Sequence, residues 1–150
     1  MNCLRVFVLS FLLGCAITTP AAGQIVINPT PPGQLLGQRL AADFNVTTDQ
    51  AIGINAAKYI VRRIVVVNAS TSLTLAVGGF YTGASKSGTT IVAATQIYTA
   101  LTAGAKWLDL TLASILGTDV LTAGTLYLSL TTAQGAAATA DVYILGDTLP

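Results

Sequence analysis

The sequence predicts an all-β fold, a single β-sandwich or jelly-roll-like domain of about eight short antiparallel strands. Three observations lead to this prediction. The apolar residues are mainly Ala, Val, Leu and Ile interleaved with Thr and Ser, a mixture that suits pleated strands. Several segments alternate apolar and polar residues with the two-residue repeat of a strand. Turn-forming residues interrupt this pattern roughly every ten residues, as in sandwiches and jelly rolls.

The alternation is clearest near the C-terminus. Leu126, Leu128 and Leu130 are expected on one side of a strand, and Tyr127 and Ser129 on the other. Similar segments, bounded by turn residues, define the remaining expected strands. The full set of expected strands is Arg39–Asn45, Gln50–Asn55, Tyr59–Asn68, Ser72–Tyr81, Thr90–Leu101, Lys106–Leu112, Thr125–Thr131 and Ala138–Leu145.

The chain is weakly charged. Only 9% of the 150 residues are charged, against about 25% in a typical soluble domain. Hydrophobic residues make up 53%, which excludes disorder for the body of the chain. Without Arg5 near the N-terminus, the basic and acidic residues cancel. Such a surface attracts nucleic acid and anionic lipid weakly and repels its own copies weakly, so we expect a homo-oligomer.

The residue types argue against chemistry, and we expect no catalytic, cofactor-binding or metal-binding residues and no enzyme. The chain has no His and no Glu, and its aspartates lack the Asp-x-Asp spacing of a calcium loop. Gly83–Thr90 superficially resembles a phosphate-binding loop. In a true phosphate-binding loop a lysine directly follows the second glycine, whereas Lys86 lies before Gly88. We expect a hairpin loop with an exposed lysine instead. The aspartates, which read mostly as solvated turn and strand-end residues, are Asp43, Asp49, Asp109, Asp119, Asp141 and Asp147.

One pair of adjacent charges adjoins the most hydrophobic strand. Arg62 and Arg63 precede Val65–Val67, an apolar run typical of a central strand that is covered on both faces. Neighbours in a strand point to opposite faces, so at least one arginine is expected near the core or an interface. It would then need an aspartate partner. The two arginines are therefore the candidate interface ion pair, with an exposed strand edge as the alternative.

Aromatic residues offer a second possible surface. They could form a carbohydrate-binding platform, although core packing and interface anchoring are commoner uses. The sequence does not decide between these uses. The residues concerned are Trp107, Tyr81, Tyr98, Tyr127 and Tyr143.

Residues 1–23 read as a secretory signal or a hydrophobic N-terminal segment. Arg5 supplies the positive charge, and the apolar run that follows is too short to span a bilayer. The small residues Ala21 and Gly23 predict cleavage before Gln24.

Two other interpretations of this segment stay open. Leu12–Cys15 resembles a bacterial lipobox, which makes Cys15 a candidate lipidation site that would tether the domain to a membrane. Alternatively, the segment is retained as a hydrophobic arm buried in an assembly. Membrane contact is expected only through this segment. Both cysteines lie within it, so the body of the chain has neither a disulfide nor a cysteine metal site.

Residues 24–37 read as a Pro-rich linker or extended arm. Pro29, Pro31 and Pro32 cannot lie inside a sheet, because proline has no N–H to donate. The predicted β-sandwich domain therefore covers residues 38–150.

Four stretches carry a family resemblance: Phe44–Ile52 (FNVTTDQAI), Tyr59–Ser70 (YIVRRIVVVNAS), Gly78–Thr102 (GGFYTGASKSGTTIVAATQIYTALT) and Leu126–Leu149 (LYLSLTTAQGAAATADVYILGDTL). They resemble small virion structural proteins of tailed bacteriophages, of the head-decoration or head-fibre kind. The resemblance implies a non-enzymatic, β-rich virion subunit that self-associates, often as a trimer, and binds a capsid or tail lattice. None of the stretches carries chemistry, and no cofactor is implied.

The signal-like N-terminus departs from that family, because virion proteins are normally assembled in the cytoplasm. The alternative is a secreted or lipid-anchored bacterial surface protein with an adhesive or structural role. It would be exported to the periplasm, to an outer-membrane anchor or to the outside of the cell. Neither interpretation includes a nucleic-acid partner.

Overall fold

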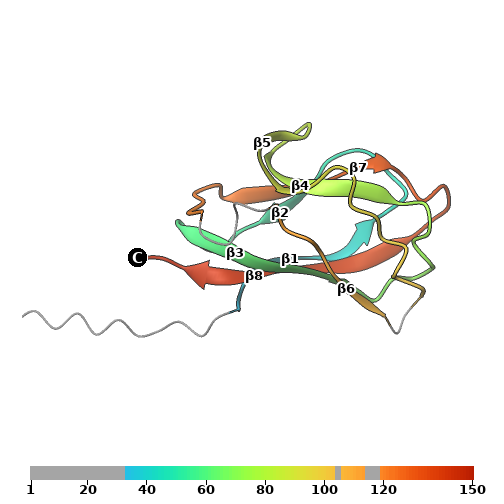
Figure 1. Ribbon diagram of the computed structural model, residues 1–150, viewed down its shortest axis with the longest axis horizontal. Coiled ribbons are helices and arrows are strands. Elements are labelled where there is room, and N and C mark those ends of the chain that lie inside the picture. The colour runs from blue at the N-terminus through green and yellow to red at the C-terminus, as the bar shows by residue number, and fades with distance from the viewer. Residues whose placement is uncertain (1–32, 104–105, 114–118) are drawn as a thin grey trace, which may run out of the picture.

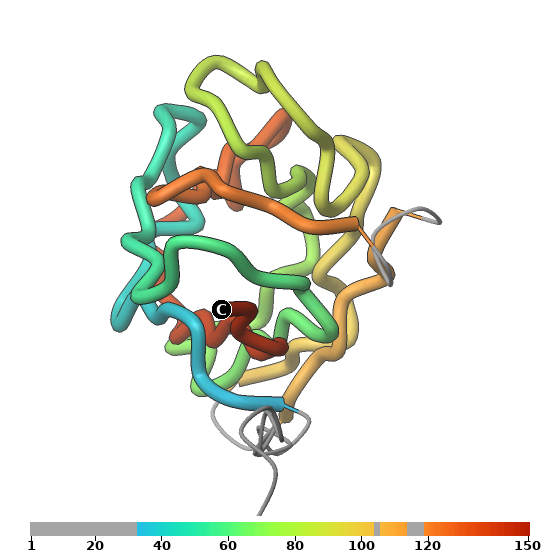
Figure 2. The backbone as a smooth tube through the Cα atoms, turned by 90° about the vertical axis from the view of Figure 1, so that its left-hand side faces the viewer, coloured from blue at the N-terminus to red at the C-terminus, as the bar shows by residue number. Residues whose placement is uncertain are grey.

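In the computed structural model, two four-stranded sheets pack face to face (Figures 1 and 2). The structure describes residues 33–103, 106–113 and 119–150, and all regular structure in these ranges is β-strand. Sheet A has the strand order β1-β8-β3-β6 and sheet B the order β2-β7-β4-β5. The strands are β1 (Gln34–Asp43), β2 (Gln50–Gly53), β3 (Tyr59–Val67), β4 (Val77–Gly83), β5 (Ser87–Val92), β6 (Trp107–Asp109), β7 (Thr125–Thr132) and β8 (Thr139–Thr148).

The strand pairs are nested. Strand β1 pairs with β8, β2 with β7, β3 with β6 and β4 with β5, as if one long hairpin had been rolled up. The further antiparallel pairs β3–β8 and β4–β7 complete the two sheets. This is the strand order of a jelly roll. The predicted fold, a β-sandwich or jelly roll of about eight antiparallel strands, is confirmed.

The predicted alternation places the core. In β8, Val142 and Ile144 are buried between the sheets, whereas Tyr143 and Leu145 are half-buried on the opposite side. The three leucines expected to share one side of β7 are all buried as well. Each sheet therefore turns one apolar face inward and leaves the other open.

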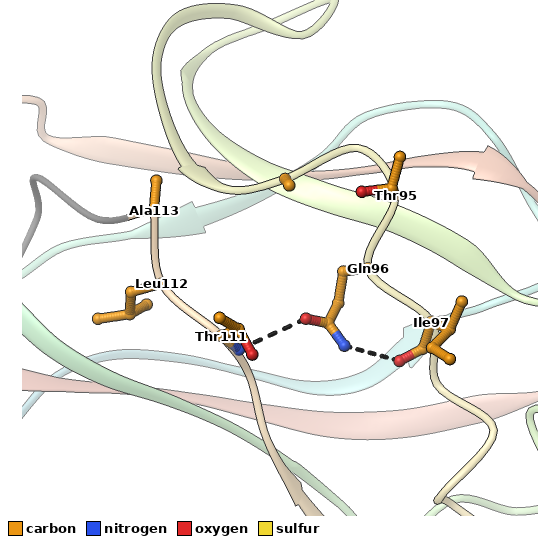
Figure 3. A pocket seen from close by; sticks show the side chains of 7 residues that line it. Thr95, Gln96, Ile97, Thr111, Leu112 and Ala113 are labelled. Atoms are coloured by element: carbon orange, nitrogen blue, oxygen red, sulfur yellow. Dashed lines mark hydrogen bonds between the residues drawn. The ribbon is translucent and has the colours of Figure 1, made fainter.

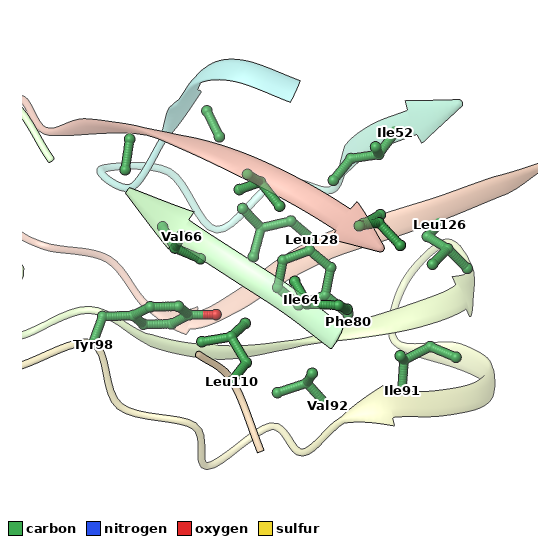
Figure 4. Close-up of a cluster of buried hydrophobic side chains, with 14 of the residues drawn as sticks. Ile52, Ile64, Val66, Phe80, Ile91, Val92, Tyr98, Leu110, Leu126 and Leu128 are labelled. Atoms are coloured by element: carbon green, nitrogen blue, oxygen red, sulfur yellow. The ribbon is translucent and has the colours of Figure 1, made fainter. Parts of the chain in front are cut away.

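Aromatic rings lie within this aliphatic core. Phe80 of β4 packs among aliphatic side chains from both sheets (Figure 4). Phe44 and Tyr98 meet edge to face, with centroids 5.0 Å apart and an interplanar angle of 72°. The hydroxyl of Tyr59 donates to the carbonyl oxygen of Ala123 at 2.7 Å. Burial raises the pKa of Tyr59 to about 12, so this hydroxyl keeps its proton and serves as a structural donor.

Several strands are shorter than predicted, including β6, which covers only three residues of the expected Lys106–Leu112, and β2, which ends at Gly53 instead of Asn55. The expected strand Ser72–Tyr81 is regular only in its second half, as β4, and the expected strand Thr90–Leu101 ends early, as β5. The excluded residues are nevertheless apolar because they close one end of the core. Leu73 donates its backbone N–H to the carbonyl oxygen of Leu101 at 2.9 Å, and both side chains are buried, as is Tyr98.

Strand β1 begins earlier than predicted. It starts at Gln34, so the sheet includes the last four residues of the segment 24–37 that was expected to be an arm. The physical reason is that no proline lies between Pro32 and the last residue, Pro150, so the backbone groups from Gln34 onward can pair with β8. Residues 1–32 lie outside the described part of the chain.

The interpretation of Val65–Val67 needs one correction. Strand β3 is central in sheet A, between β8 and β6, as predicted. Only Val66 is buried, however, and Val65 and Val67 are half-buried on the outer face. Their apolar character therefore contributes to an open face of sheet A.

Gly146 in β8 lies where sheet A is most crowded. Strands β1 and β3 both have a β-bulge where they pair with this part of β8. A Cβ atom on Gly146 would lie 2.0 Å from the carbonyl oxygen of Ile60 in β3 and 2.7 Å from the side chain of Leu36 in β1. The backbones can approach this closely only because the residue has no side chain.

We expect Gly146→Ala to lower the free energy of unfolding by about 1–3 kcal/mol or more, because a backbone carbonyl cannot move aside cheaply. Gly53→Ala in β2 is the matched control, since a Cβ there meets nothing within 4 Å. It should change stability by less than about 0.5 kcal/mol. Urea unfolding of both variants measures the difference, and equal effects would contradict this explanation.

Candidate functional site

The candidate site lies on the outer face of sheet A, and a β-bulge builds it. In β3 the register with β8 shifts between Val61 and Arg63, so that Arg62 is the extra residue. Val61 and Ile64 on either side are buried, and both arginines point outward. Of the two places expected for an arginine, the core is therefore excluded, because strict alternation fails at a bulge, and the interface stays a prediction.

Each arginine has an aspartate partner, as predicted for one of them. The Nε atom of Arg62 lies 2.6 Å from Oδ2 of Asp147 on β8, and Nε of Arg63 lies 2.6 Å from Oδ2 of Asp109 on β6. The two pairs therefore connect β3 with both of its neighbours in the sheet. Their contribution to an interface stays a prediction.

Trp107 completes this group of residues. It lies two residues before Asp109 in β6, on the same outer face, and its exposed fraction is 58%. The guanidinium carbon of Arg63 lies 5.2 Å from the centre of the indole ring. This cation–π contact and the ion pair hold Arg63 between the indole ring and a carboxylate.

The two ion pairs differ in burial. The side chain of Asp109 is 42% exposed, whereas that of Asp147 is only 22% exposed. One carboxylate oxygen of Asp147, Oδ1, is fully buried and has no hydrogen-bond partner among the described residues. Buried acceptors normally have a hydrogen-bond donor, so the unsatisfied Oδ1 of Asp147 is an unusual feature of this ion pair.

The segment Gly83–Thr90 forms the β4–β5 hairpin, as expected, with Lys86 exposed at its tip. Ser85 and Lys86 both have positive φ angles, of 56° and 59°. The backbone N–H of Ser87 donates to the carbonyl oxygen of Ala84 at 3.2 Å. These features define a type I′ turn, here without the usual Asn or Gly.

Asp49 supports this strained turn. Its carboxylate accepts hydrogen bonds from the hydroxyl of Ser129, at 2.6 Å, and from the backbone N–H of Ser85. The hydroxyl bond and then the backbone bond hold the pKa of Asp49 below its ordinary value of 3.8. The interpretation of the aspartates as solvated residues is therefore wrong for Asp49, as it is for Asp147.

The aromatic residues do not form one platform. Tyr81 and Tyr98 are buried, and burial raises the pKa of both hydroxyls. Trp107 and Tyr143 lie on the outer side of sheet A, and Tyr127 lies on the outer side of sheet B. Only Trp107 is a large exposed aromatic residue within the described ranges.

A separate hollow of about 290 Å³ lies between the segments that follow β5 and β6 (Figure 3). The Gln96 side chain crosses it, accepting from the N–H of Thr111 at 3.4 Å and donating to the carbonyl oxygen of Ile97 at 2.7 Å. None of the residues that line the hollow is ionisable. It offers neither an acid nor a base, and we assign it no chemistry.

Within residues 33–103, 106–113 and 119–150, no three His, Cys, Asp or Glu side chains gather closely enough to hold a metal ion. That part of the chain also has no helix with the length and apolar character needed to cross a membrane. The candidate lipidation residue Cys15 and the signal-like segment 1–23 lie outside the described residues.

Comparison with known proteins identifies no relative. No family model matches the sequence, and neither a curated protein nor a solved structure matches it. The resemblance to phage virion proteins therefore stays a prediction from the residues quoted above. Sequence reasoning missed the roles of Asp109, Asp147 and Asp49, since their partners come from strands distant in the sequence.

We expect Arg62→Ala to cost about 1–2 kcal/mol of stability, because it leaves the partly buried Asp147 without its charged partner. Arg63→Ala should cost less than about 1 kcal/mol, since its pair is exposed at both ends. Thermal or urea unfolding measures both. Lys86→Ala, at the exposed tip of the β4–β5 hairpin in sheet B, is the control and should fall within about 0.5 kcal/mol. The reverse order of the two arginine variants would contradict the burial argument.

Asp49 should make the protein sensitive to acid. Its lowered pKa means that it stabilises the fold above its unfolded value of 3.8, and that this contribution is lost as the pH falls through the lower folded value. Urea midpoints at about pH 6 and about pH 3 should therefore differ more for the wild type than for Asp49→Asn. An identical pH dependence in both proteins would show that the carboxylate does not support the hairpin.

Proposed function

We propose that this protein is a non-enzymatic structural subunit that associates with further copies of itself through the β6 end of the outer face of sheet A. The observation that carries the proposal is Trp107, a large exposed side chain held in place by its contact with Arg63. Tryptophan and arginine are the residues most enriched among the energetic anchors of protein interfaces. Because both side chains are already ordered, association loses little rotamer entropy.

The surroundings of Trp107 suit contact with another copy. Val67, its partner across the β3–β6 pair, is half-buried on the same face and adds apolar surface. Arg63 forms an ion pair with Asp109, so burying this surface against another copy would not leave the charge of Arg63 unpaired. Contact of this surface with a different patch on the next copy can close into a ring such as a trimer. Apart from the N-terminal Arg5, the basic and acidic residues of the chain balance. A net charge near zero gives little electrostatic repulsion between copies, so it favours association.

The assembly we favour is a phage virion, in which the subunit, as a small homo-oligomer such as a trimer, decorates a capsid or tail lattice. The four stretches quoted from the sequence support this choice. The jelly-roll order supports it only by analogy of fold, because viral capsid proteins and lectins both use that fold. An exported bacterial surface protein is the second candidate, and the signal-like residues 1–23 favour it. The neighbouring genes separate the two, since capsid, portal or tail genes on both sides support the virion and an isolated chromosomal locus supports export.

We expect the wild-type chain to sediment as an oligomer at micromolar concentration and Trp107→Ala to weaken association by at least about 2 kcal/mol, about thirtyfold in Kd. Leu75→Ala is the matched control, because Leu75 is 60% exposed but lies outside sheet A. A wild-type monomer would refute self-association. An oligomer that survives Trp107→Ala would refute this surface alone.

A further inference from the structure

The hollow between the segments that follow β5 and β6 lies on a different side of the molecule from the outer face of sheet A. Strand β5 is an edge strand of sheet B, and β6 is an edge strand of sheet A. The segments beyond them are joined by the bridge between Val92 and Leu112 and by the hydrogen bond from the N–H of Ala113 to the carbonyl oxygen of Ile91. The hollow therefore opens at the side of the sandwich, between the two layers (Figures 1 and 3).

The lining of this hollow suits an uncharged apolar group. Ile97 contributes to it and is 54% exposed, and Leu112, Ala93 and Ala113 supply further apolar surface. No ionisable side chain lines the hollow, so a neutral group can enter without burying an unpaired charge. Sites for drug-sized ligands span about 300–1,000 Å³. A hollow of about 290 Å³ is therefore better matched to a single large side chain.

Gln96 gives the hollow a hydrogen-bond acceptor with spare capacity. Among the described residues, its Oε1 atom accepts from the backbone N–H of Thr111 at 3.4 Å, which is long for such a bond. An amide oxygen has two lone pairs, so Oε1 can accept a second hydrogen bond from a group that enters the hollow (Figure 3). A large apolar ring with one N–H donor fits these features, and the indole of tryptophan is such a ring.

Trp107 is the one tryptophan of the chain, and its indole is exposed. In its own subunit the contact with Arg63 keeps the ring on the outer face of sheet A, away from the hollow. We propose that Trp107 of one copy inserts into this hollow of the next copy, with the indole N–H donating to Oε1 of Gln96. The inference rests on the proposed function and names the patch that receives Trp107. Because the two patches differ, the contact is head to tail, and repeating it closes a ring or extends a filament.

A carboxylate in the hollow tests the contact. Ala93 lines the hollow and is exposed, so Ala93→Glu adds a charge that an incoming indole would bury. We expect it to weaken association of the full chain about thirtyfold or more in Kd, as Trp107→Ala does, and to leave the urea midpoint nearly unchanged. Ala136→Glu is the matched control, because it adds the same charge at an exposed alanine between β7 and β8, and it should associate like the wild type.

Sedimentation velocity separates the two ways of failing. If Ala93→Glu assembles like the wild type while Trp107→Ala does not, Trp107 binds elsewhere on the next copy; this inference is then wrong and the proposed function stands. A wild-type monomer would refute the proposed function, and the inference with it.

Mixing the two variants tests the head-to-tail geometry directly. Trp107→Ala keeps an intact hollow, and Ala93→Glu keeps an intact Trp107, so an equimolar mixture retains one working contact. We expect the mixture to form a heterodimer and nothing larger, while each variant alone stays monomeric at the same concentration. Measurements should extend to about 1 mM, where even a contact with a millimolar Kd is populated. The absence of a heterodimer there would overturn the inference.

Discussion

The missing side chain at Gly146 is the constraint on which sheet A depends. Strand β8 lies between β1 and β3, and both neighbours bulge within two residues of Gly146 along the strand. The carbonyl oxygen of Ile60 and the side chain of Leu36 occupy the space that a Cβ would need. Close approach on both sides allows Leu36 to enter the core from β1 while β3 accommodates an extra residue. A single glycine in a central strand thus adjusts the register on both of its sides.

The outer face follows from this irregularity. The extra residue in β3 turns Arg62 and Arg63 to the same side, where alternation would have divided them. Their aspartates come from β8 and β6, one on each side of β3. The exposed Arg63–Asp109 pair contributes little to stability and mainly orients Arg63, whereas the Arg62–Asp147 pair is partly buried. Arg63 is thereby held against Trp107, and Arg62 is held beside Asp147.

The fold could be predicted from the sequence because alternation is a local property. It located β7 to within one residue and β8 except for its last three residues, with Leu128 and Val142 on the buried side. It failed around Leu73 and Tyr98, where apolar loop residues close the end of the core and have strand-like composition. The candidate site was predicted only in part. The sequence indicates that an arginine in this strand should pair with an aspartate. It does not identify Asp147, because that partner is brought close only by strand pairing between residues 85 positions apart.

The edges of the sheets suggest why association should use a face and not strand addition. Strand β6 has only three residues, and β2 has four. Strand β1 is longer, but it has two bulges, and the side-chain amide of Gln50 bonds to both the N–H and the carbonyl oxygen of Asp43 at its end. The edge of β5 carries a bridge from Leu112 to Val92. Short, bulged and capped edges are how β-proteins prevent backbone pairing between copies. With backbone pairing disfavoured at these edges, the proposed contact between copies would have to come from side chains, and among the described residues the largest exposed one is the indole of Trp107.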